Sequence, residues 1–311
     1  MNVFGENWTF TSFGESHGAA IGGVLDGVPA GLKIDLAMIR EELDRRAGRK
    51  PNPNPSLKGR EVGVSARAAN EPDEVEWLSG VMDGVTLGTP IAFIIRNRNA
   101  RPEDYEYLKH TYRVGHADKV YEQKYGIRDW RGGGRASARE TAARVVAGCI
   151  AKQELASKGI EIHAQLVQVG AETDPAKFAD TIAAYQQEGD SIGGIIECRI
   201  NGLPVGVGEP IFDKLQAHLA FAVMSINACK GFEYGTGFAG VTQPSSAINT
   251  ISGGISGGIS DGSEIVFRCV FKPTPSTPKA GVKGRHDACV ATRAVPVVEA
   301  MTALALINLM H

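Results

Sequence analysis

Residues 113–159 read RVGHADKVYEQKYGIRDWRGGGRASARETAARVVAGCIAKQELASKG. Ser137 and Glu140 have the S-x-x-E spacing of a capping box, in which each side chain bonds the backbone N–H of the other, and they predict a helix start. The helical pattern ends at Lys158 and Gly159, a basic residue followed by a glycine, which predicts the end of the helix. Its apolar side recurs at helical spacing and consists of Ala138, Ala142, Val145, Val146, Cys149 and Ile150.

The turn before this helix, residues 131–135, has three glycines between two arginines. Free N–H groups and the positive end of the helix dipole point the same way there, so the turn predicts an anion site. Arg135 and Arg139 add formal charge, and arginine suits bidentate contacts with phosphate or carboxylate groups. His116 lies shortly before the turn. Together these residues indicate a polyanionic ligand, such as a phosphorylated molecule, with a histidine nearby.

The composition is that of an ordinary globular protein, with 311 residues of which 43% are hydrophobic and 22% charged. The net charge of −2 provides no basic field, so we expect neither nucleic acid nor a membrane surface as a partner. No run reaches the roughly 20 apolar residues of a membrane helix, and residues 1–10 lack a signal-peptide pattern. Five dispersed cysteines fit reduced thiols. These features predict a cytoplasmic protein.

Apolar runs and alternation predict strands at residues 8–13, 20–25, 89–96, 160–169, 193–199 and 264–271. Helices are expected from the Asp35 cap to Arg46 and at residues 174–187, 212–224 and 295–310. Residues 75–80 fit a short helix or a strand, and residues 48–67 read as a long loop. The order follows no regular βαβ rhythm and has no clear boundary. We therefore predict one domain, residues 1–311, with antiparallel or mixed sheets.

Residues 14–18, GESHG, match the G-x-S-x-G nucleophile elbow of serine hydrolases, which requires a strand, a sharp turn and then a helix. The next residues contain Gly22 and Gly23 and read as a strand, so this context fails. A hydrolase that uses Ser16 is kept as an alternative. Otherwise His17 is either an acid in a glycine turn or a structural or exposed histidine.

Two later segments combine charge with turn geometry. Asp287 follows Arg285 closely, and the pair reads either as a general base beside a substrate anchor or as a solvated charged turn. Residues 272–276, KPTPS, place an ammonium and two hydroxyls on a stiffened loop, which suits phosphate or simply makes a rigid connection. The sequence contains no phosphate-loop motif and no histidine and cysteine cluster with zinc spacing, so we predict no metal site.

Five blocks of the sequence, in order, closely resemble the chorismate synthase family. They are GESHGAAIGGVLDGVPAG (14–31), the first 36 residues of the stretch quoted above (113–148), GDSIGG (189–194), MSINACKGFEYG (224–235) and KGRHDACVATRAVPVVEAM (283–301). The resemblance implies an α+β fold, a three-layer β-α-β sandwich, and a homotetramer that uses reduced FMN. It also implies a lyase that converts 5-enolpyruvylshikimate 3-phosphate into chorismate and phosphate. This 1,4-anti-elimination has no net redox change and is the last step of the shikimate pathway, which leads to the aromatic amino acids.

The resemblance also implies roles for individual residues. His17 is similar to the acid that protonates the departing phosphate, and His116 to the histidine that protonates or holds the reduced flavin. Asp287 is similar to the base that removes the C6 proton through flavin N5. The implied substrate anchors are Arg46, Arg113, Arg139 and Arg285. The implied FMN contacts are Arg135, Ala136, Ser137, Asn227, Ala228, Gly257, Lys272, Pro273, Thr274, Pro275, Ser276 and Arg285.

Arg46 also matches an NADP-binding position in some members of the family. The 311 residues contain no visible reductase domain, so NADPH would act from outside, through a separate flavin reductase.

The chain departs from the family pattern at several places. Ala136 stands where the family has a serine, and Ala288 stands where it has a proline. The arginine- and threonine-rich loop expected after Arg46 is replaced, so no substrate arginine is assigned in it. The loops at 242–253 and 276–283 are also shorter than usual. A homologue that binds flavin or substrate but has an incomplete lid is therefore a second hypothesis.

Overall fold

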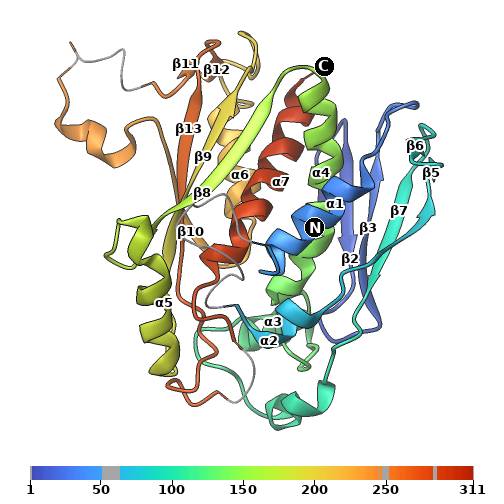
Figure 1. The fold of residues 1–311 in the computed structure, drawn as a ribbon, viewed down its shortest axis with the longest axis vertical. Helices are drawn as coiled ribbons and strands as arrows, with labels where there is room; N and C mark the ends of the chain where they lie inside the picture. The colour runs from blue at the N-terminus through green and yellow to red at the C-terminus, as the bar shows by residue number, and fades with distance from the viewer. Residues whose placement is uncertain (1, 51–63, 245, 247–251, 283–285, 311) are drawn as a thin grey trace.

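The computed structural model describes residues 2–50, 64–244, 246, 252–282 and 286–310. Two antiparallel sheets lie on either side of a layer of helices, as Figure 1 shows. This is the three-layer β-α-β arrangement expected above. Each strand pairs in the antiparallel sense wherever the described chain forms a ladder.

The N-terminal sheet has the order β1-β2-β3-β7-β4. In its strand β7 the side chains of Ile91, Phe93 and Ile95 are buried and alternate with more exposed ones, the pattern of a strand with one face on a core. The strands are β1 (Val3–Phe4), β2 (Thr9–Phe13), β3 (Ala20–Asp26), β4 (Val75–Ser79) and β7 (Ile91–Arg96). Of the residues 75–80, for which the sequence left a helix or a strand open, Val75–Ser79 form a strand.

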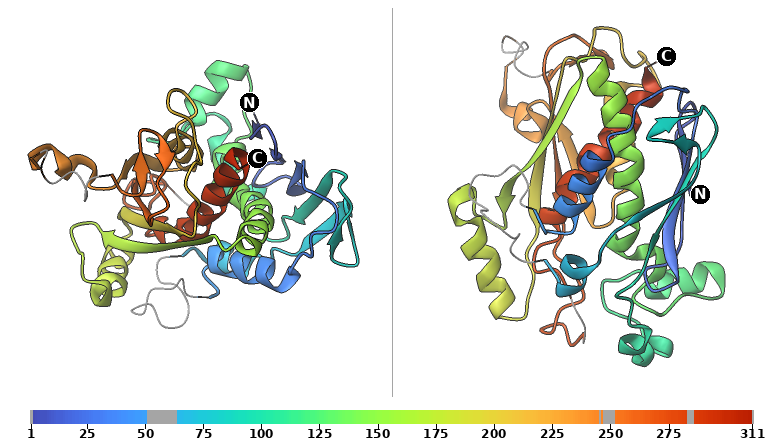
Figure 2. Two further views of the ribbon diagram at one scale, coloured as in Figure 1. Left: turned by 90° about the horizontal axis from the view of Figure 1, so that it is seen from above. Right: turned by 45° about the vertical axis from the view of Figure 1, so that its right-hand side comes forward.

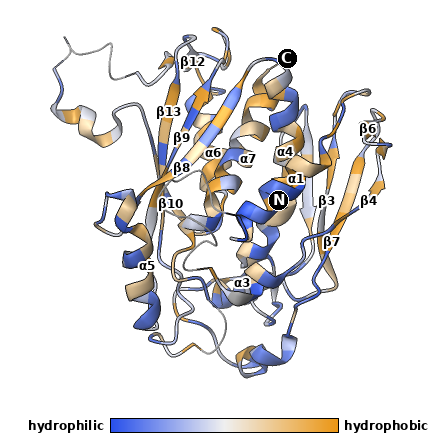
Figure 3. Ribbon diagram, in the orientation of Figure 1, coloured by the Kyte–Doolittle hydropathy of each residue, from blue (hydrophilic) through white to orange (hydrophobic). Residues whose placement is uncertain are grey.

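The second sheet has the order β10-β13-β9-β8. The strands of this second sheet are β8 (Glu161–Val169), β9 (Gly194–Asn201), β10 (Cys229–Tyr234) and β13 (Ile265–Phe271). Figure 3 shows apolar colour along β13 and, in the N-terminal sheet, along β7. Two small hairpins pair β5 (Val81–Met82) with β6 (Val85–Thr86) and β11 (Ile255–Ser256) with β12 (Ile259–Ser260).

Four helices form the middle layer, and the two views of Figure 2 show them between the sheets. They are α1 (Leu36–Arg46), α4 (Thr141–Ser157), α6 (Leu215–Met224) and α7 (Ala291–Leu309). The remaining helices are α2 (Ala66–Asn70), α3 (Asp118–Tyr125) and α5 (Phe178–Gln187). Short 3₁₀ segments cover Pro102–Lys109, Gly134–Ala136, Ala138–Glu140, Pro175–Lys177 and Gly237–Thr242.

The contact between α4 and α7 is the centre of the middle layer. Gly148 makes it possible, because a Cβ at this position would lie 2.4 Å from Cα of Ala300. By length and composition α7 passes as a candidate membrane span, but 89% of its apolar window is buried inside the protein. Its apolar character is therefore explained by its place between the two sheets.

The start of α4 differs from the capping box predicted above. Ser137 accepts a hydrogen bond from the N–H of Arg139 at 3.3 Å rather than from that of Glu140. The Glu140 carboxylate instead pairs with Arg144, 3.0 Å away. The first turn is 3₁₀, and the α-helix begins at Thr141. The prediction of a helix here was right and the prediction of its cap was wrong.

Other predicted helix boundaries also differ from those in the structure. The helix α7 begins at Ala291 rather than Val295, so that Pro296 lies inside it. Neither α2 nor α3 was expected. The former follows Ser65, whose side chain accepts from the N–H of Ala68 and caps the helix. Of the long loop predicted at 48–67, residues 51–63 lie outside the described residues.

Candidate functional site

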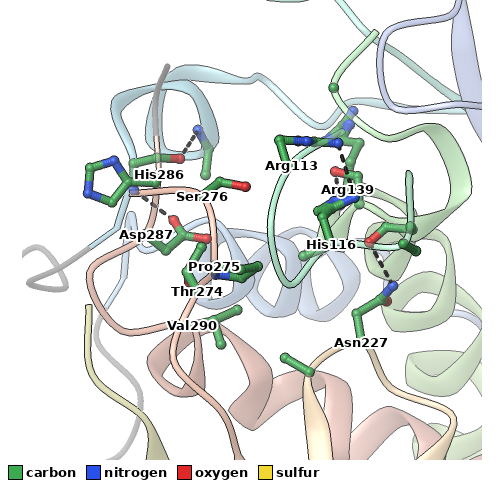
Figure 4. A pocket seen from close by; sticks show the side chains of 18 of the residues that line it. Arg113, His116, Arg139, Asn227, Thr274, Pro275, Ser276, His286, Asp287 and Val290 are labelled. Atoms are coloured by element: carbon green, nitrogen blue, oxygen red, sulfur yellow. Dashed lines mark hydrogen bonds between the residues drawn. The ribbon is translucent and has the colours of Figure 1, made fainter. Parts of the chain in front are cut away.

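A cavity of about 420 Å³ lies at the end of the molecule where α4 and α7 begin. This volume falls within the roughly 300–1,000 Å³ of typical small-molecule sites. Residues 136–139, which lead into α4, line one part of it, and Asp287 and Val290, which precede α7, line another. Figure 4 shows His116, Arg113 and Arg139 on one side and Asp287, Thr274 and Pro275 on the other. The positive ends of two long helices thus border the same cavity.

The lining of the cavity is strongly cationic. Among the residues that the structure describes, the carboxylates of the lining are those of Glu71 and Asp287. The cationic side chains in this part of the lining are those of Arg46, Arg67, Arg113, Arg139, Lys272 and Arg293. A protein with a net charge of −2 therefore concentrates positive charge at one place, which favours a ligand with several negative charges.

Asp118, the first residue of α3, holds two of the lining residues in place. Its carboxylate accepts from Nε and Nη2 of Arg113 at 2.9 and 2.8 Å, and lies 2.8 Å from Nδ1 of His116. Burial alone would raise the pKa of Asp118, but the hydrogen bonds from Arg113 and His116 outweigh it and hold this pKa well below its usual range. The carboxylate fixes a planar arginine and an imidazole side by side.

Asp73 plays the same part for Arg139. The buried Asp73 carboxylate accepts from Nη1 of Arg139, and burial, which would raise its pKa, is outweighed by the charges of Arg139 and Arg46. Nε of Arg46 donates to the hydroxyl of Thr141 at 2.9 Å. Burial lowers the pKa of Arg46 to about 9, and the nearby charge of Arg293 acts in the same direction. Several positively charged side chains therefore lie close together in a buried part of the site.

Asp287 has a partner on each carboxylate oxygen. Oδ2 lies 2.7 Å from Nη1 of Arg293, and Oδ1 accepts from the N–H of Ser65 at 2.8 Å. Ser65 is also the cap of α2, so the same residue starts that helix and orients the carboxylate.

Two polar atoms of the lining residues have no partner among the residues that the structure describes. They are Oδ1 of Asn227 and Oγ1 of Thr274, both buried. Nδ2 of Asn227 donates to the carbonyl of Ala136 at 3.2 Å. Buried polar atoms without partners are costly in a native protein. Their presence in the cavity fits a bound polar group such as FMN.

The predicted site residues fall into two groups. The structure brings many of them to the lining of one cavity: Arg46, Arg113, His116, Ala136, Ser137, Arg139, Asn227, Ala228, Lys272, Thr274, Pro275, Ser276 and Asp287.

The other predicted residues are placed elsewhere. Nη2 of Arg135 donates to the hydroxyl of Ser12, away from the cavity, because its side chain leaves the glycine turn on the side of β2. Gly257 lies in the β11–β12 hairpin, at the opposite end of the molecule in Figure 1. Pro273 is exposed and does not line the cavity. Arg285 lies outside the described residues.

His17 is buried behind the lining, in the turn between β2 and β3. Its Nδ1 lies 3.0 Å from Oγ of Ser16, while its Nε2 lies 2.8 Å from a guanidinium nitrogen of Arg67. A serine hydrolase needs a strand–turn–helix elbow and a carboxylate behind the histidine. Here the turn joins two strands and the histidine faces a cation, so the arrangement contradicts a nucleophilic Ser16.

Several residues of the lining were not predicted from the sequence, among them Arg67, Glu71, Tyr105 and Arg293. None belongs to a local pattern that signals a ligand. Arg293 alone had a weak signal, because it lies within one of the blocks that resemble the family.

A cationic cavity that holds a histidine–aspartate pair and a second aspartate is typical of an enzyme site for a small anionic molecule. The family model described as chorismate synthase matches residues 8–311. The chain therefore belongs to the chorismate synthase family, a family of lyases.

Proteins with similar sequences match this chain over almost its whole length. A protein named chorismate synthase from Christiangramia forsetii is 44% identical, and the match covers 98% of this chain and 96% of that protein. One from Phocaeicola vulgatus is also 44% identical, with 99% and 97% covered. A solved structure titled "Crystal Structure of Chorismate Synthase" has a TM-score of 0.76 at 29% identity, and the match covers 98% of this chain and 92% of that one. The fold expected from the resemblance is thereby confirmed.

Proposed function

We propose that this chain catalyses the 1,4-anti-elimination of phosphate from 5-enolpyruvylshikimate 3-phosphate to give chorismate, with reduced FMN bound, as the last step of the shikimate pathway. The observation that carries the proposal is the cavity itself. Its cluster of arginines suits the phosphate and the two carboxylates of this substrate. His116 and Asp287 lie on different sides of the cavity. Arg113 and Arg139 are each pre-oriented by an aspartate, which lowers the entropy lost when a ligand binds.

The residues of the lining fit FMN. Asn227 and Thr274 each have a buried polar atom without a partner in the described part of the chain, and Lys272 offers an ammonium for a phosphate. Nζ of Lys272 donates to the carbonyl of Gly115 at 3.0 Å. This bond joins the loop of residues 272–276, which would contact FMN, to the loop that carries His116. Bound reduced FMN would supply electrons to the reaction and recover them, so that no net oxidation results. NADPH, through an external flavin reductase, would provide the reduced state.

The proton transfers are assigned to three side chains. Asp287 is the base for the C6 proton, and its carboxylate is held by Arg293 and by the N–H of Ser65. His116 holds or protonates the flavin, and its Nδ1 is fixed by Asp118. His17 is the acid for the departing phosphate, and it can act only after Arg67 has moved, because that side chain covers it. Arg46, Arg113 and Arg139 anchor the substrate, and Arg285 is kept as a fourth anchor by resemblance alone.

We further propose, on the strength of the family resemblance, that the chain forms a single domain, assembles as a homotetramer and is located in the cytoplasm. Nothing in the cavity lining suggests a nucleic acid or a lipid as its ligand.

An anaerobic assay tests the proposal. Purified protein with photoreduced FMN and 5-enolpyruvylshikimate 3-phosphate should release chorismate and phosphate in equal amounts, and oxidised FMN should support neither. Folded protein that yields no chorismate with reduced FMN would contradict it.

One observation favours a second candidate, a homologue that binds its ligands without turnover. The match to the Christiangramia forsetii protein extends over 353 aligned positions, more than the 311 residues of this chain, so that protein contains stretches that this chain lacks. Calorimetry separates the two. Tight binding of substrate together with no elimination would support the binding-only homologue.

A further inference from the structure

Asn97 follows the last residue of β7 and connects the turn of His17 to Arg139. Its Nδ2 donates to the carbonyls of Glu15 and Gly18, at the two ends of that turn, at 3.0 and 2.9 Å. Its Oδ1 accepts from Nε of Arg139 at 2.8 Å. One amide therefore contacts the segment that carries the proposed acid and a proposed substrate anchor, although Asn97 itself does not line the cavity.

These partners fix the orientation of the amide. The hydrogens of Nδ2 point at two carbonyls, and Oδ1 points at a guanidinium, which can only donate. Flipping the amide would place its NH₂ group against Arg139 and its oxygen against the carbonyls of Glu15 and Gly18, so these hydrogen bonds would all be lost. The backbone is also held, since the N–H of Asn97 donates to the carbonyl of Ala19 at 3.1 Å. Asn97 is therefore a rigid link.

Arg139 is held from several sides at the end of β7. Its Nη1 donates to the buried carboxylate of Asp73, while its Nε donates to Asn97. Its Nη2 lies 3.5 Å from the carbonyl of Arg96. Because Arg139 lines the cavity, the N–H groups not used in these contacts are the ones that can meet a ligand. The position of a substrate bound to Arg139 is therefore set by Asn97, Arg96 and Asp73.

The turn of His17 is closed by its own backbone and attached to β7 through Asn97. It joins β2 to β3, and the N–H of Gly18 donates to the carbonyl of Glu15 at 3.0 Å. The carbonyl of Glu15 thus accepts twice, once from within the turn and once from Asn97. Acid and anchor come from different parts of the chain, the β2–β3 turn and the start of α4, and Asn97 contacts both parts.

We propose that Asn97 is a positioning residue for the elimination, which holds the turn of His17 against Arg139 so that a substrate anchored by Arg139 has its phosphate within reach of the acid. The inference rests on the proposed function and adds to it a residue that touches neither substrate nor flavin. Proton transfer to the departing phosphate depends on such geometry, because a misplacement of about 1 Å can slow a reaction about a hundredfold.

Two substitutions test this role in the anaerobic assay with reduced FMN. Asn97→Ala removes the amide, and Asn97→Asp keeps an acceptor for Arg139 but, as a carboxylate, has no donor for the carbonyls of Glu15 and Gly18. We expect kcat to fall about ten- to a hundredfold in both variants. Substrate affinity, measured by calorimetry with oxidised FMN, should change by less than about threefold in Asn97→Ala, because Asp73 still holds Arg139.

Asn308→Ala is the matched control. Oδ1 of Asn308 accepts from the N–H of Glu6 at 2.8 Å, and its Nδ2 donates to the carbonyl of Trp8 at 3.0 Å, so this asparagine ties the segment between β1 and β2 to α7. It lies near the end of the 19-residue helix α7, of which Arg293, near the beginning, lines the cavity. Asn308→Ala should lower the urea midpoint of unfolding and leave kcat unchanged.

A double-mutant cycle determines whether Asn97 acts through His17. Residues that work as a unit have effects that do not add. Asn97→Ala should therefore slow the parent protein much more than it slows His17→Ala, which has no acid to position. A general loss of structure would instead slow both backgrounds by the same factor.

NMR provides a readout that requires no turnover. The ring resonances of His17 should shift in Asn97→Ala, while those of His116, which is held by Asp118, should stay in place. Unchanged His17 resonances, a parental kcat in either Asn97 variant, or an equal factor in both backgrounds would overturn the role of Asn97. So would an equal loss of kcat in Asn308→Ala. Parent protein that releases no chorismate would instead overturn the proposed function and the role of Asn97 with it.

Discussion

Replacing Glu299 by glutamine perturbs the ion network that joins the middle layer to the second sheet. Glu299 lies on α7 and is only 1% exposed. Its carboxylate lies 2.9 Å from Nη1 of Arg45 on α1 and 2.7 Å from Nζ of Lys152 on α4. It also accepts from the N–H of Ala164 on β8 at 2.9 Å. One carboxylate thus connects four elements.

The pKa of this group sets the magnitude. Burial alone would raise the pKa of Glu299, but the charges of Lys152 and Arg45 outweigh it and lower the pKa from its ordinary 4.5 to about 2. A depressed carboxylate pKa stabilises the folded state above the unfolded value and loses that effect as pH falls through the folded value. This shift corresponds to a contribution of about 3 kcal/mol to the free energy of unfolding at pH 7. Loss of one partner of a buried ion pair typically costs about 3–5 kcal/mol, which agrees.

Urea unfolding at pH 7 and pH 3.5, at fixed protein concentration, measures the effect. We expect Glu299→Gln to lose about 3 kcal/mol at pH 7. At pH 3.5 the parent protein has already lost about 1 kcal/mol of this contribution, so the difference should narrow to about 2 kcal/mol. The control is Glu264→Gln, since Glu264 pairs with Arg199 at the surface and should matter by less than about 0.5 kcal/mol. An equal cost at both pH values, or a cost below about 1 kcal/mol at pH 7, would refute the reasoning.

Three further predictions concern packing, orientation and the cofactor. Gly148→Val should destabilise the protein by at least about 2 kcal/mol in urea unfolding, because its Cβ meets the backbone of Ala300 and the helices must separate; unchanged stability would contradict this contact. Asp118→Asn should lower kcat/KM by about tenfold or more in the anaerobic assay, since it releases Arg113 and His116 together; a parental value would contradict the positioning role. Thr274→Val should weaken FMN about three- to tenfold in a fluorescence titration without destabilising the protein, because its hydroxyl lacks a partner in the described chain; unchanged FMN affinity would remove Thr274 from the flavin site.

The sequence was most informative where local signals and tertiary structure agree. The alternation at Ile91, Phe93 and Ile95 gave β7, and Asp35 caps α1 through the N–H groups of Ala37 and Met38. The capping box at Ser137 failed because its groups have other nearby partners: the N–H of Ser137 donates to the carbonyl of Gly134 at 3.3 Å, and the Glu140 carboxylate pairs with Arg144. The same turn also has a tertiary contact. Arg46, from a distant helix, donates to the carbonyl of Ala138 at 2.7 Å in that first turn. A pattern of four residues does not contain this contact.

The site shows the same limit. Gly132 of the glycine turn and His116 line the cavity, but the sequence does not indicate where a long side chain points. Arg135 and Arg139 look alike in the sequence, yet one donates to Ser12 and the other lines the cavity. Arg67 carries no local signal, because the fold alone brings α2 against the turn of His17.

The central claim is that this cavity carries out the elimination, and Asp287→Asn tests it most directly. The assay measures chorismate release with anaerobically reduced FMN, alongside calorimetric binding of 5-enolpyruvylshikimate 3-phosphate, with Glu264→Gln as the control. We predict that the variant still binds the substrate but turns it over at least about 100-fold more slowly, the scale of a lost acid–base catalyst. Turnover near the parental rate in Asp287→Asn would contradict the account.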